Sequence, residues 1–133
     1  MILVDTSVWI DHLRRGEPHL AELLDRGVAA IHDFVIGEIA CGNLGNRQEV
    51  LSLLSWLPKC ESATHEEALF FIERNRLMGR GIGYIDACLL AAATLSSARL
   101  WTRDKRLAGI AEELGCAYLP KTEHAGKRQD SGH

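Results

Sequence analysis

Four acidic residues of this sequence lie in or just after apolar runs: Asp5, Glu38, Asp86 and Asp104. The first and the last each follow a short apolar run of the kind that forms a strand. The other two are each the only charge in a long apolar stretch. Because burying an unpaired carboxylate is costly, each must either point outward through a polar window or be offset by a positive charge.

Taken singly, most of these residues also have an ordinary structural interpretation. Asp5 precedes a helix-like pattern and could cap it through its side chain. Asp86 would lie in the first turn of a helix, where the helix dipole favours a negative charge. Asp104 lies between two basic residues and could be a turn or cap residue. Glu38 has neither a helix end nor a cationic neighbour in the sequence to explain it.

Taken together, the four carboxylates predict a metal site. Two like charges about 4 Å apart repel by roughly 4 kcal/mol at an effective dielectric constant near 20, so they converge only around a cation. A hard divalent ion such as Mg²⁺ or Mn²⁺ would bind them and leave positions for water and phosphate. One ion or two would lower the pKa of a bound water and shield a phosphate. A free carboxylate could orient or deprotonate the attacking water.

Short apolar runs alternate with helical patterns along the chain. We expect strands at 2–4, 28–31, 99–102 and 117–119. We expect a first helix that follows the cap residues 5–7 and ends near residue 16, and further helices at 18–26, 34–44, 48–57, 66–78, 84–97 and 107–114. This alternation indicates an α/β fold with a mainly parallel sheet. Ligands of such sheets bind beyond the carboxyl ends of the strands. If the strands before Asp5 and Asp104 are neighbours, both carboxylates lie in that crevice, a hypothesis that local sequence alone does not fix.

Length and composition bound the remaining possibilities. The chain has 133 residues, 47% of them hydrophobic and 25% charged, which is typical of one folded domain. We expect this domain to cover residues 1–120 and the aperiodic segment 121–133 to be a flexible tail. A net charge of −3 argues against a general nucleic-acid coat protein, although it permits local phosphate contacts. The absence of a secretory or membrane-spanning pattern predicts a cytoplasmic protein.

The cysteines and histidines show no ligand spacing. Cys41, Cys60, Cys88 and Cys116 form no C-x-x-C pair, so we expect buried, reduced thiols rather than a disulfide or metal site. The six histidines are scattered without an H-x-x-x-H pair, and we assign them to the surface or the core.

Four short motifs resemble those of PIN domains. Leu3-Val4-Asp5-Thr6-Ser7-Val8-Trp9-Ile10 resembles the opening motif of the family. Gly37-Glu38, Tyr84-Ile85-Asp86-Ala87 and Thr102-Arg103-Asp104 resemble its second, third and fourth acidic motifs, in the right order. Each motif alone is weakly specific, but the four together span Met1 to about Leu119, and they resemble most the VapC-like toxins of bacterial toxin–antitoxin pairs.

This resemblance implies a fold, an activity and partners. The fold would be a three-layer α/β/α PIN-like fold with a central, mainly parallel sheet. The activity would be that of an endoribonuclease toxin that needs Mg²⁺ or Mn²⁺ and cleaves structured RNA such as transfer or ribosomal RNA. The protein would form a homodimer and bind a cognate antitoxin whose C-terminal segment covers the acidic site.

The resemblance also assigns roles to individual residues. Catalytic and metal-binding roles fall on the four carboxylates of Asp5, Glu38, Asp86 and Asp104. Thr6, Ser7 and Thr102 would support them with their hydroxyl groups.

The sequence departs from the family at one place. Many relatives carry a further acidic residue shortly after the fourth motif, whereas Lys105 and Arg106 follow here. A fifth carboxylate and a firmly bound second metal ion are therefore not expected. These cations could instead bind RNA phosphates together with Arg14 or Arg80, although basic groups of this kind are more often solvated helix surfaces. The segment 79–81 could form a flexible rim or a plain loop.

Two other functions compete with the ribonuclease. One is a Mg²⁺-dependent phosphotransfer or receiver-like α/β domain. Asp5-Thr6-Ser7 lacks the second aspartate of a D-x-D motif, and Lys105 is not convincingly placed for a receiver lysine. The other is a catalytically inactive PIN module that only binds a protein partner. Retention of all four carboxylates argues against it.

Overall fold

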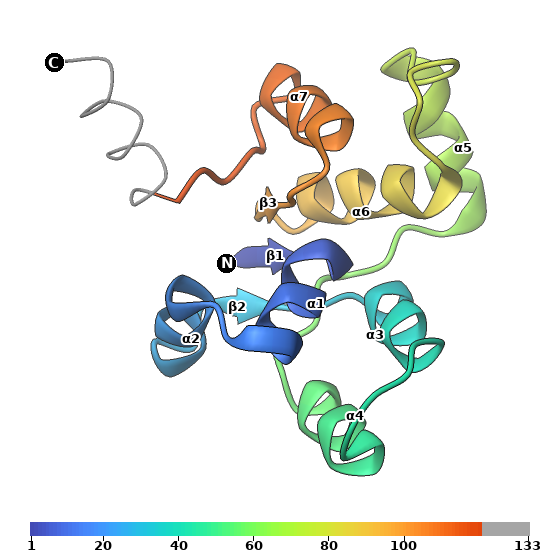
Figure 1. Ribbon diagram of the computed structural model, residues 1–133. Coiled ribbons are helices and arrows are strands. Elements are labelled where there is room, and N and C mark those ends of the chain that lie inside the picture. Colours follow the sequence, from blue (N-terminus) through green and yellow to red (C-terminus); the bar gives the residue numbers. More distant parts are fainter. Residues whose placement is uncertain (121–133) are drawn as a thin grey trace, which may run out of the picture.

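The computed structural model describes residues 1–120 as alternating strands and helices (Figure 1). The predicted tail 121–133 lies outside the described residues. The strands are β1 (Ile2–Val4), β2 (Ala29–Ala30) and β3 (Arg99–Trp101). The helices are α1 (Thr6–Arg15), α2 (Pro18–Asp25), α3 (Asp33–Ala40), α4 (Arg47–Ser55), α5 (His65–Arg74), α6 (Tyr84–Leu95) and α7 (Lys105–Glu113). This is the predicted α/β class, with a three-stranded sheet flanked by seven helices in the described part of the chain.

The sheet has the strand order β2-β1-β3, and both pairings are parallel. Val4 at the end of β1 is in register with Trp101 at the end of β3. The hypothesis that the strands before Asp5 and Asp104 are neighbours is therefore confirmed. Because both strands run the same way, their carboxyl ends lie at one edge of the sheet.

The predicted strand at 117–119 is wrong. Ala117 forms only an isolated parallel bridge with Leu100, made by bonds from the Leu100 N–H to the Cys116 carbonyl (2.7 Å) and from the Tyr118 N–H to the Leu100 carbonyl (2.8 Å). The next bond of this parallel ladder, from the Thr102 N–H to the Tyr118 carbonyl, does not form in residues 1–120. The bond after it would need an N–H at position 120, which is a proline and has none.

Helix α5 ends at Arg74, four residues before the predicted end. The chain leaves the helix through Arg76, whose φ of 53° lies in the left-handed region. The Leu77 N–H then bonds back to the Ile72 carbonyl at 3.0 Å, which satisfies a carbonyl of the last turn. The hydrophobic periodicity of the helix does not predict this end, because the end depends on contacts with residues that follow the helix.

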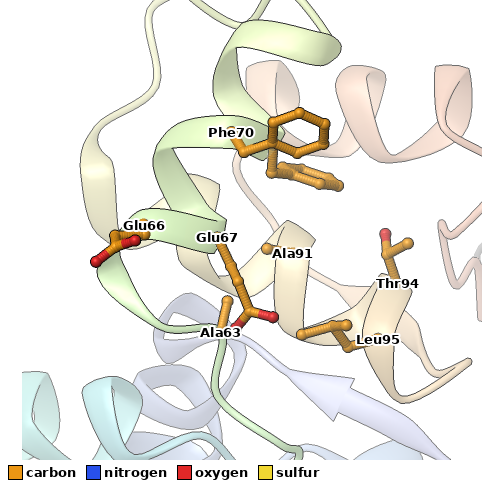
Figure 2. Close-up of a pocket in the computed structure, with 8 residues that line it drawn as sticks. Ala63, Glu66, Glu67, Phe70, Ala91, Thr94 and Leu95 are labelled. Atoms are coloured by element: carbon orange, nitrogen blue, oxygen red, sulfur yellow. The ribbon is translucent and has the colours of Figure 1, made fainter.

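A groove runs between α5 and α6. Its volume is about 360 Å³, and its lining is largely apolar. Figure 2 shows Phe70 of α5 near Ala91 and Leu95 of α6. Glu67 also lines the groove, but its carboxylate accepts a bond from the Thr64 N–H at 2.8 Å in a capping box that begins α5.

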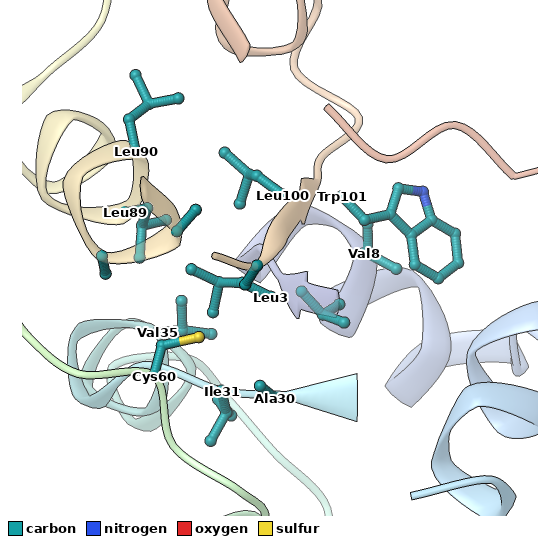
Figure 3. Packing of buried hydrophobic residues seen from close by; sticks show 14 of the residues in the cluster. Leu3, Val8, Ala30, Ile31, Val35, Cys60, Leu89, Leu90, Leu100 and Trp101 are labelled. Atoms are coloured by element: carbon teal, nitrogen blue, oxygen red, sulfur yellow. The ribbon is translucent and has the colours of Figure 1, made fainter. Parts of the chain in front are cut away.

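The main core lies between the sheet and the helices. Leu3 of β1 and Leu100 of β3 are 0% and 1% exposed and lie beside Leu89 of α6 and Val35 of α3 (Figure 3). Residues 87–93 of α6 are all buried, and four of these are alanines, which allow a helix to approach the sheet closely. The small side chains thus allow α6 to pack closely in the core.

Helix α3 is anchored at its start by a buried histidine. His32 is 1% exposed; its Nδ1 accepts the Phe34 N–H at 3.0 Å, and its Nε2 lies 3.1 Å from the Ser62 hydroxyl. Because Nδ1 is an acceptor, the ring is neutral, with its proton on Nε2. Burial lowers the pKa of His32, although the charge of Asp33 acts the other way. A neutral imidazole thus caps the helix that carries Glu38.

Three of the four cysteines are buried as predicted, and all four are free thiols. The prediction is wrong for Cys41, which is exposed because it follows the last turn of α3 at the surface. None of the helices in residues 1–120 combines the length and the apolar character needed to cross a membrane.

Candidate active site

Asp5 follows β1 directly, and two hydroxyl groups hold its side chain. Its N–H donates to the Trp101 carbonyl at 2.9 Å, which continues the sheet pairing by one bond. Its Oδ2 accepts from the Ser7 hydroxyl at 2.9 Å and from the Thr102 hydroxyl at 2.7 Å. Asp5 occupies the N-cap position of α1 but makes no side-chain cap bond. The side-chain capping interpretation is therefore wrong: this carboxylate, 7% exposed, is held by two hydroxyl groups instead.

The turn after β3 brings Asp104 to the same edge of the sheet. The Asp104 N–H donates to the Thr102 hydroxyl at 3.1 Å. Asp104 Oδ1 accepts the N–H groups of Arg106 at 2.9 Å and Leu107 at 3.0 Å, so this residue does cap α7. The Thr102 hydroxyl thus links Asp104 to Asp5, because it bonds to both residues.

Glu38 reaches the site from α3. Its Oε1 accepts the Thr6 hydroxyl at 2.5 Å, which ties α3 to the first turn of α1. Glu38 is an exposed residue, so its carboxylate avoids a burial penalty by pointing outward from an otherwise apolar helix. This exposure agrees with the polar window, one of the two explanations that the sequence left open.

Asp86 lies in the first turn of α6, as predicted. Burial is the main cause that raises the pKa of Asp86, opposed by the bond from the Gly83 N–H, 3.4 Å from Oδ2. The negative charges of Asp5, Asp104 and Glu38 raise it further, in that order. The four carboxylates therefore share one electrostatic neighbourhood, although they come from four separate segments.

A common pattern joins the four carboxylates. Each one uses a single oxygen in the hydrogen bonds described above: Oδ2 of Asp5, Oε1 of Glu38, Oδ2 of Asp86 and Oδ1 of Asp104. Within residues 1–120, the second oxygen of each has no protein hydrogen-bond partner. Each carboxylate is thus oriented through one oxygen, and its other oxygen is left without a protein partner in the described residues.

This donor set suits a hard divalent cation. Carboxylate oxygens with open positions for water are the ligands that Mg²⁺ and Mn²⁺ prefer. In the described part of the chain, no three potential ligand groups already stand close enough together to hold an ion. Like charges favour such a spread arrangement, so ion binding would have to draw the side chains together.

The predicted RNA-binding cations differ in how free they are. Arg14 and Lys105 are exposed, whereas the Arg80 guanidinium pairs with Glu113 at 2.7 Å, which offsets its charge. The Arg106 side chain packs over Gly81, where a Cβ would lie 2.8 Å from the Arg106 Cδ. Gly81 also has a φ of +84°, a backbone conformation that favours glycine, whereas the contact alone could be relieved by a shift of the flexible Arg106 side chain. Arg106 is therefore held against the loop that precedes α6.

Arg103 was not predicted as a site residue. Its guanidinium forms ion pairs with Asp11, 2.7 Å from Nε, and with Glu17. Its N–H donates to the Ser7 hydroxyl at 3.0 Å. Its place between Thr102 and Asp104 was the only signal in the sequence, because both carboxylate partners are remote.

Comparison with known proteins gives the family. The model of the PIN domain matches residues 2–113. Ribonuclease VapC32 of Mycobacterium tuberculosis is 50% identical over 118 residues, which cover 88% of this chain and 95% of that protein.

Solved structures agree on the fold. PAE2754 from Pyrobaculum aerophilum aligns with a TM-score of 0.64 at 19% identity and covers 88% of this chain and 87% of its own. A toxin-antitoxin complex from Klebsiella pneumoniae aligns with a TM-score of 0.62 at 24% identity and covers 83% of this chain and 92% of its own.

The match excludes the phosphotransfer and receiver-like alternatives, since it covers most of the chain, including all four acidic motifs. With the fold, the arrangement of the carboxylates and this similarity in agreement, the chain belongs to the PIN-domain family, as a VapC-like member.

Proposed function

We propose that this protein is a metal-dependent endoribonuclease that acts as the toxin of a toxin–antitoxin pair. The observation that carries the proposal is the pattern of the four carboxylates, each oriented by one oxygen and open at the other. The ribonuclease activity is supported by 50% identity to a protein named as a ribonuclease.

In this proposal Asp5, Glu38, Asp86 and Asp104 hold Mg²⁺ or Mn²⁺. Bound there, the ion would shield the negative charge of a phosphodiester and make water a better nucleophile. The chain supplies the alignment: Ser7 and Thr102 fix Asp5, and Thr6 fixes Glu38. A carboxylate oxygen that faces the attacking water would accept its proton.

The substrate we propose is structured RNA, such as transfer or ribosomal RNA. We propose that three exposed cations contact its phosphates: Arg14 on α1 and Lys105 and Arg106 on α7. Arg80 would contribute less, because Glu113 already pairs with it. A net charge of −3 fits an enzyme that grips a few phosphates locally.

The proposed partners are a second copy of the chain and a cognate antitoxin. A protein of the same fold from Klebsiella pneumoniae was solved as a toxin-antitoxin complex. An antitoxin C-terminal segment with an arginine would complement the open carboxylate oxygens by bidentate pairing. Such a segment would cover the site and exclude RNA.

The test compares wild type with Asp5→Asn in cells. The wild type is induced, all RNA 5′ ends are sequenced, and discrete new ends are expected within a structured RNA. The variant keeps an oxygen for Ser7 and Thr102 but removes the charge, so it should fold normally and produce no new ends. Equal melting temperatures of the two purified proteins are the control. The same new ends with Asp5→Asn would refute the proposed site.

A further inference from the structure

The side chain of Arg103 joins three separate segments. Its Nε lies 2.7 Å from Asp11 Oδ2 on α1, and its Nη2 pairs with Glu17 Oε1 just before α2. Its guanidinium also lies over the ring of Trp101, 5.7 Å from the ring centroid. Arg103, Asp11 and Glu17 are only 31%, 28% and 22% exposed, so these charges are partly shielded from water. Such pairs are more persistent than fully exposed ones.

Glu17 is itself held in place by other bonds. Its Oε2 accepts the His19 N–H at 3.1 Å and thereby caps α2. Its own N–H donates to Nδ1 of His12 at 3.0 Å. Arg103 therefore pairs with a side chain, that of Glu17, which is already held in place in the connection between α1 and α2.

The backbone of Arg103 reaches the carboxylates. Its N–H donates to the Ser7 hydroxyl, which in turn donates to Asp5 Oδ2. The neighbours of Arg103 in sequence are Thr102, which also bonds to Asp5, and Asp104. A shift of Arg103 would therefore move parts of the site on both sides of it.

We propose that Arg103 is a positioning residue whose ion pairs hold the turn 102–104 against α1 and so set Asp104 in place relative to Asp5. For its effect on catalysis this inference rests on the proposed function; for the placement of the turn it does not. The charge of Arg103 is engaged by two carboxylates, which argues against a primary role in binding RNA.

The test uses three variants and one matched control. Arg103→Met keeps an apolar stem over Trp101 but removes both ion pairs, and Arg103→Lys keeps the charge. The double variant Asp11→Asn/Glu17→Gln removes both charged partners, while the amide oxygen that it introduces at position 17 can still cap α2. The control is Arg15→Met, because Arg15 pairs with the same Asp11 at 3.3 Å but is 76% exposed.

The first measurement needs neither metal nor RNA. Amide hydrogen exchange of residues 103 and 104 should be about tenfold faster in Arg103→Met and in the double variant, since local opening becomes easier. Exchange of residues 87–93, in the buried part of α6, should not change. Wild-type exchange at 103 and 104 in a folded double variant would overturn the inference even if Arg103→Met fails to fold.

The second measurement follows the consequence for the site. In Arg103→Met, the Kd for Mn²⁺ should rise about tenfold, and kcat on bulk transfer RNA should fall about tenfold with KM unchanged. Arg103→Lys should recover part of this loss. Arg15→Met should match the wild type within about twofold. A raised KM with unchanged kcat would show that Arg103 binds RNA and would overturn the positioning role. If the wild type neither binds Mn²⁺ nor cleaves RNA, the proposed function fails, while the exchange rates still decide whether Arg103 holds the turn.

Discussion

Two surfaces of this domain differ in what holds their side chains. At the carboxyl ends of β1 and β3, hydroxyl and amide groups fix each carboxylate through one of its oxygens. In the groove between α5 and α6, by contrast, Phe70 is 66% exposed and Leu95 is 48% exposed, and neither can form a directional bond. The groove is largely apolar, and the one lining carboxylate described above, that of Glu67, is engaged in the capping box of α5. For ion chemistry, pre-oriented oxygens matter more than depth.

The largest expected difference between the two surfaces is in metal binding. Mn²⁺ at one hundred times its Kd should stabilise the wild type by about 2.7 kcal/mol, because the ion binds only the folded site. The same concentration should not stabilise Asp5→Asn to this degree, whereas Phe70→Ser should respond like wild type. Thermal melts with Mn²⁺ and with EDTA measure this. No shift in the wild type at millimolar Mn²⁺ would count heavily against the nuclease.

The next effect concerns His32, which anchors α3 and hence Glu38. Because burial holds the pKa of His32 below its usual range, the unfolded chain takes up the proton first. Stability from this residue is therefore complete above about pH 6.5 and is lost as the pH falls below that value, by at most about 1.4 kcal/mol per pH unit. Melting temperatures from pH 8 to pH 5 should fall less steeply in His32→Asn, which keeps a cap acceptor. Equal slopes in both proteins would contradict the assignment.

A smaller effect of opposite sign is expected at Asp86. Burial and then three neighbouring carboxylates disfavour its charge, so the charge destabilises the metal-free fold at neutral pH. Asp86→Asn should raise the free energy of unfolding in EDTA by about 1 kcal/mol and weaken Mn²⁺ binding at the same time. Chemical denaturation at pH 7 checks the first part, and titration calorimetry checks the second. Destabilisation in EDTA would mean that the repulsion is not felt.

The smallest effect is expected in the groove. Phe70→Ser removes an exposed ring, so stability should change by no more than about 0.5 kcal/mol and RNA cleavage by less than twofold. Cleavage assays at matched protein concentration test this. A tenfold loss of RNA cleavage would mean that the groove also takes part in the activity, so that the two surfaces would no longer differ in this respect.

The sequence predicted the acidic residues of the site better than it predicted the groups that hold them in place. Asp5 and Asp104 could be paired in advance, because parallel strands place their carboxyl ends at one edge. The bond between Thr6 and Glu38 could not, since it depends on how α1 packs against α3. Asp5 was equally compatible with a cap, and only the placement of Ser7 and Thr102 decides otherwise.

The remaining misses have the same origin. The role of Arg103 depends on carboxylates from a different part of the chain, and Cys41 is exposed because of where α3 ends against the rest of the domain. Hydrophobic periodicity shows which face of a helix or strand is buried. It does not show which polar group from a distant part of the chain contacts that helix or strand. The pairing at Ala117 ends after a single bridge, and the proline at position 120, which the sequence did contain, could not have donated a bond to a longer ladder.

The bond between Thr102 and Asp5 joins residues 97 positions apart, and β3 is the last strand of the sheet. During translation the N-terminal part of a chain emerges from the ribosome first and begins to fold before the rest exists. Asp5 is therefore synthesised early, but Thr102 and Asp104 can approach it only after nearly the whole domain has been synthesised. Chains that end before residue 102 would lack both the fourth carboxylate and the hydroxyl that orients the first.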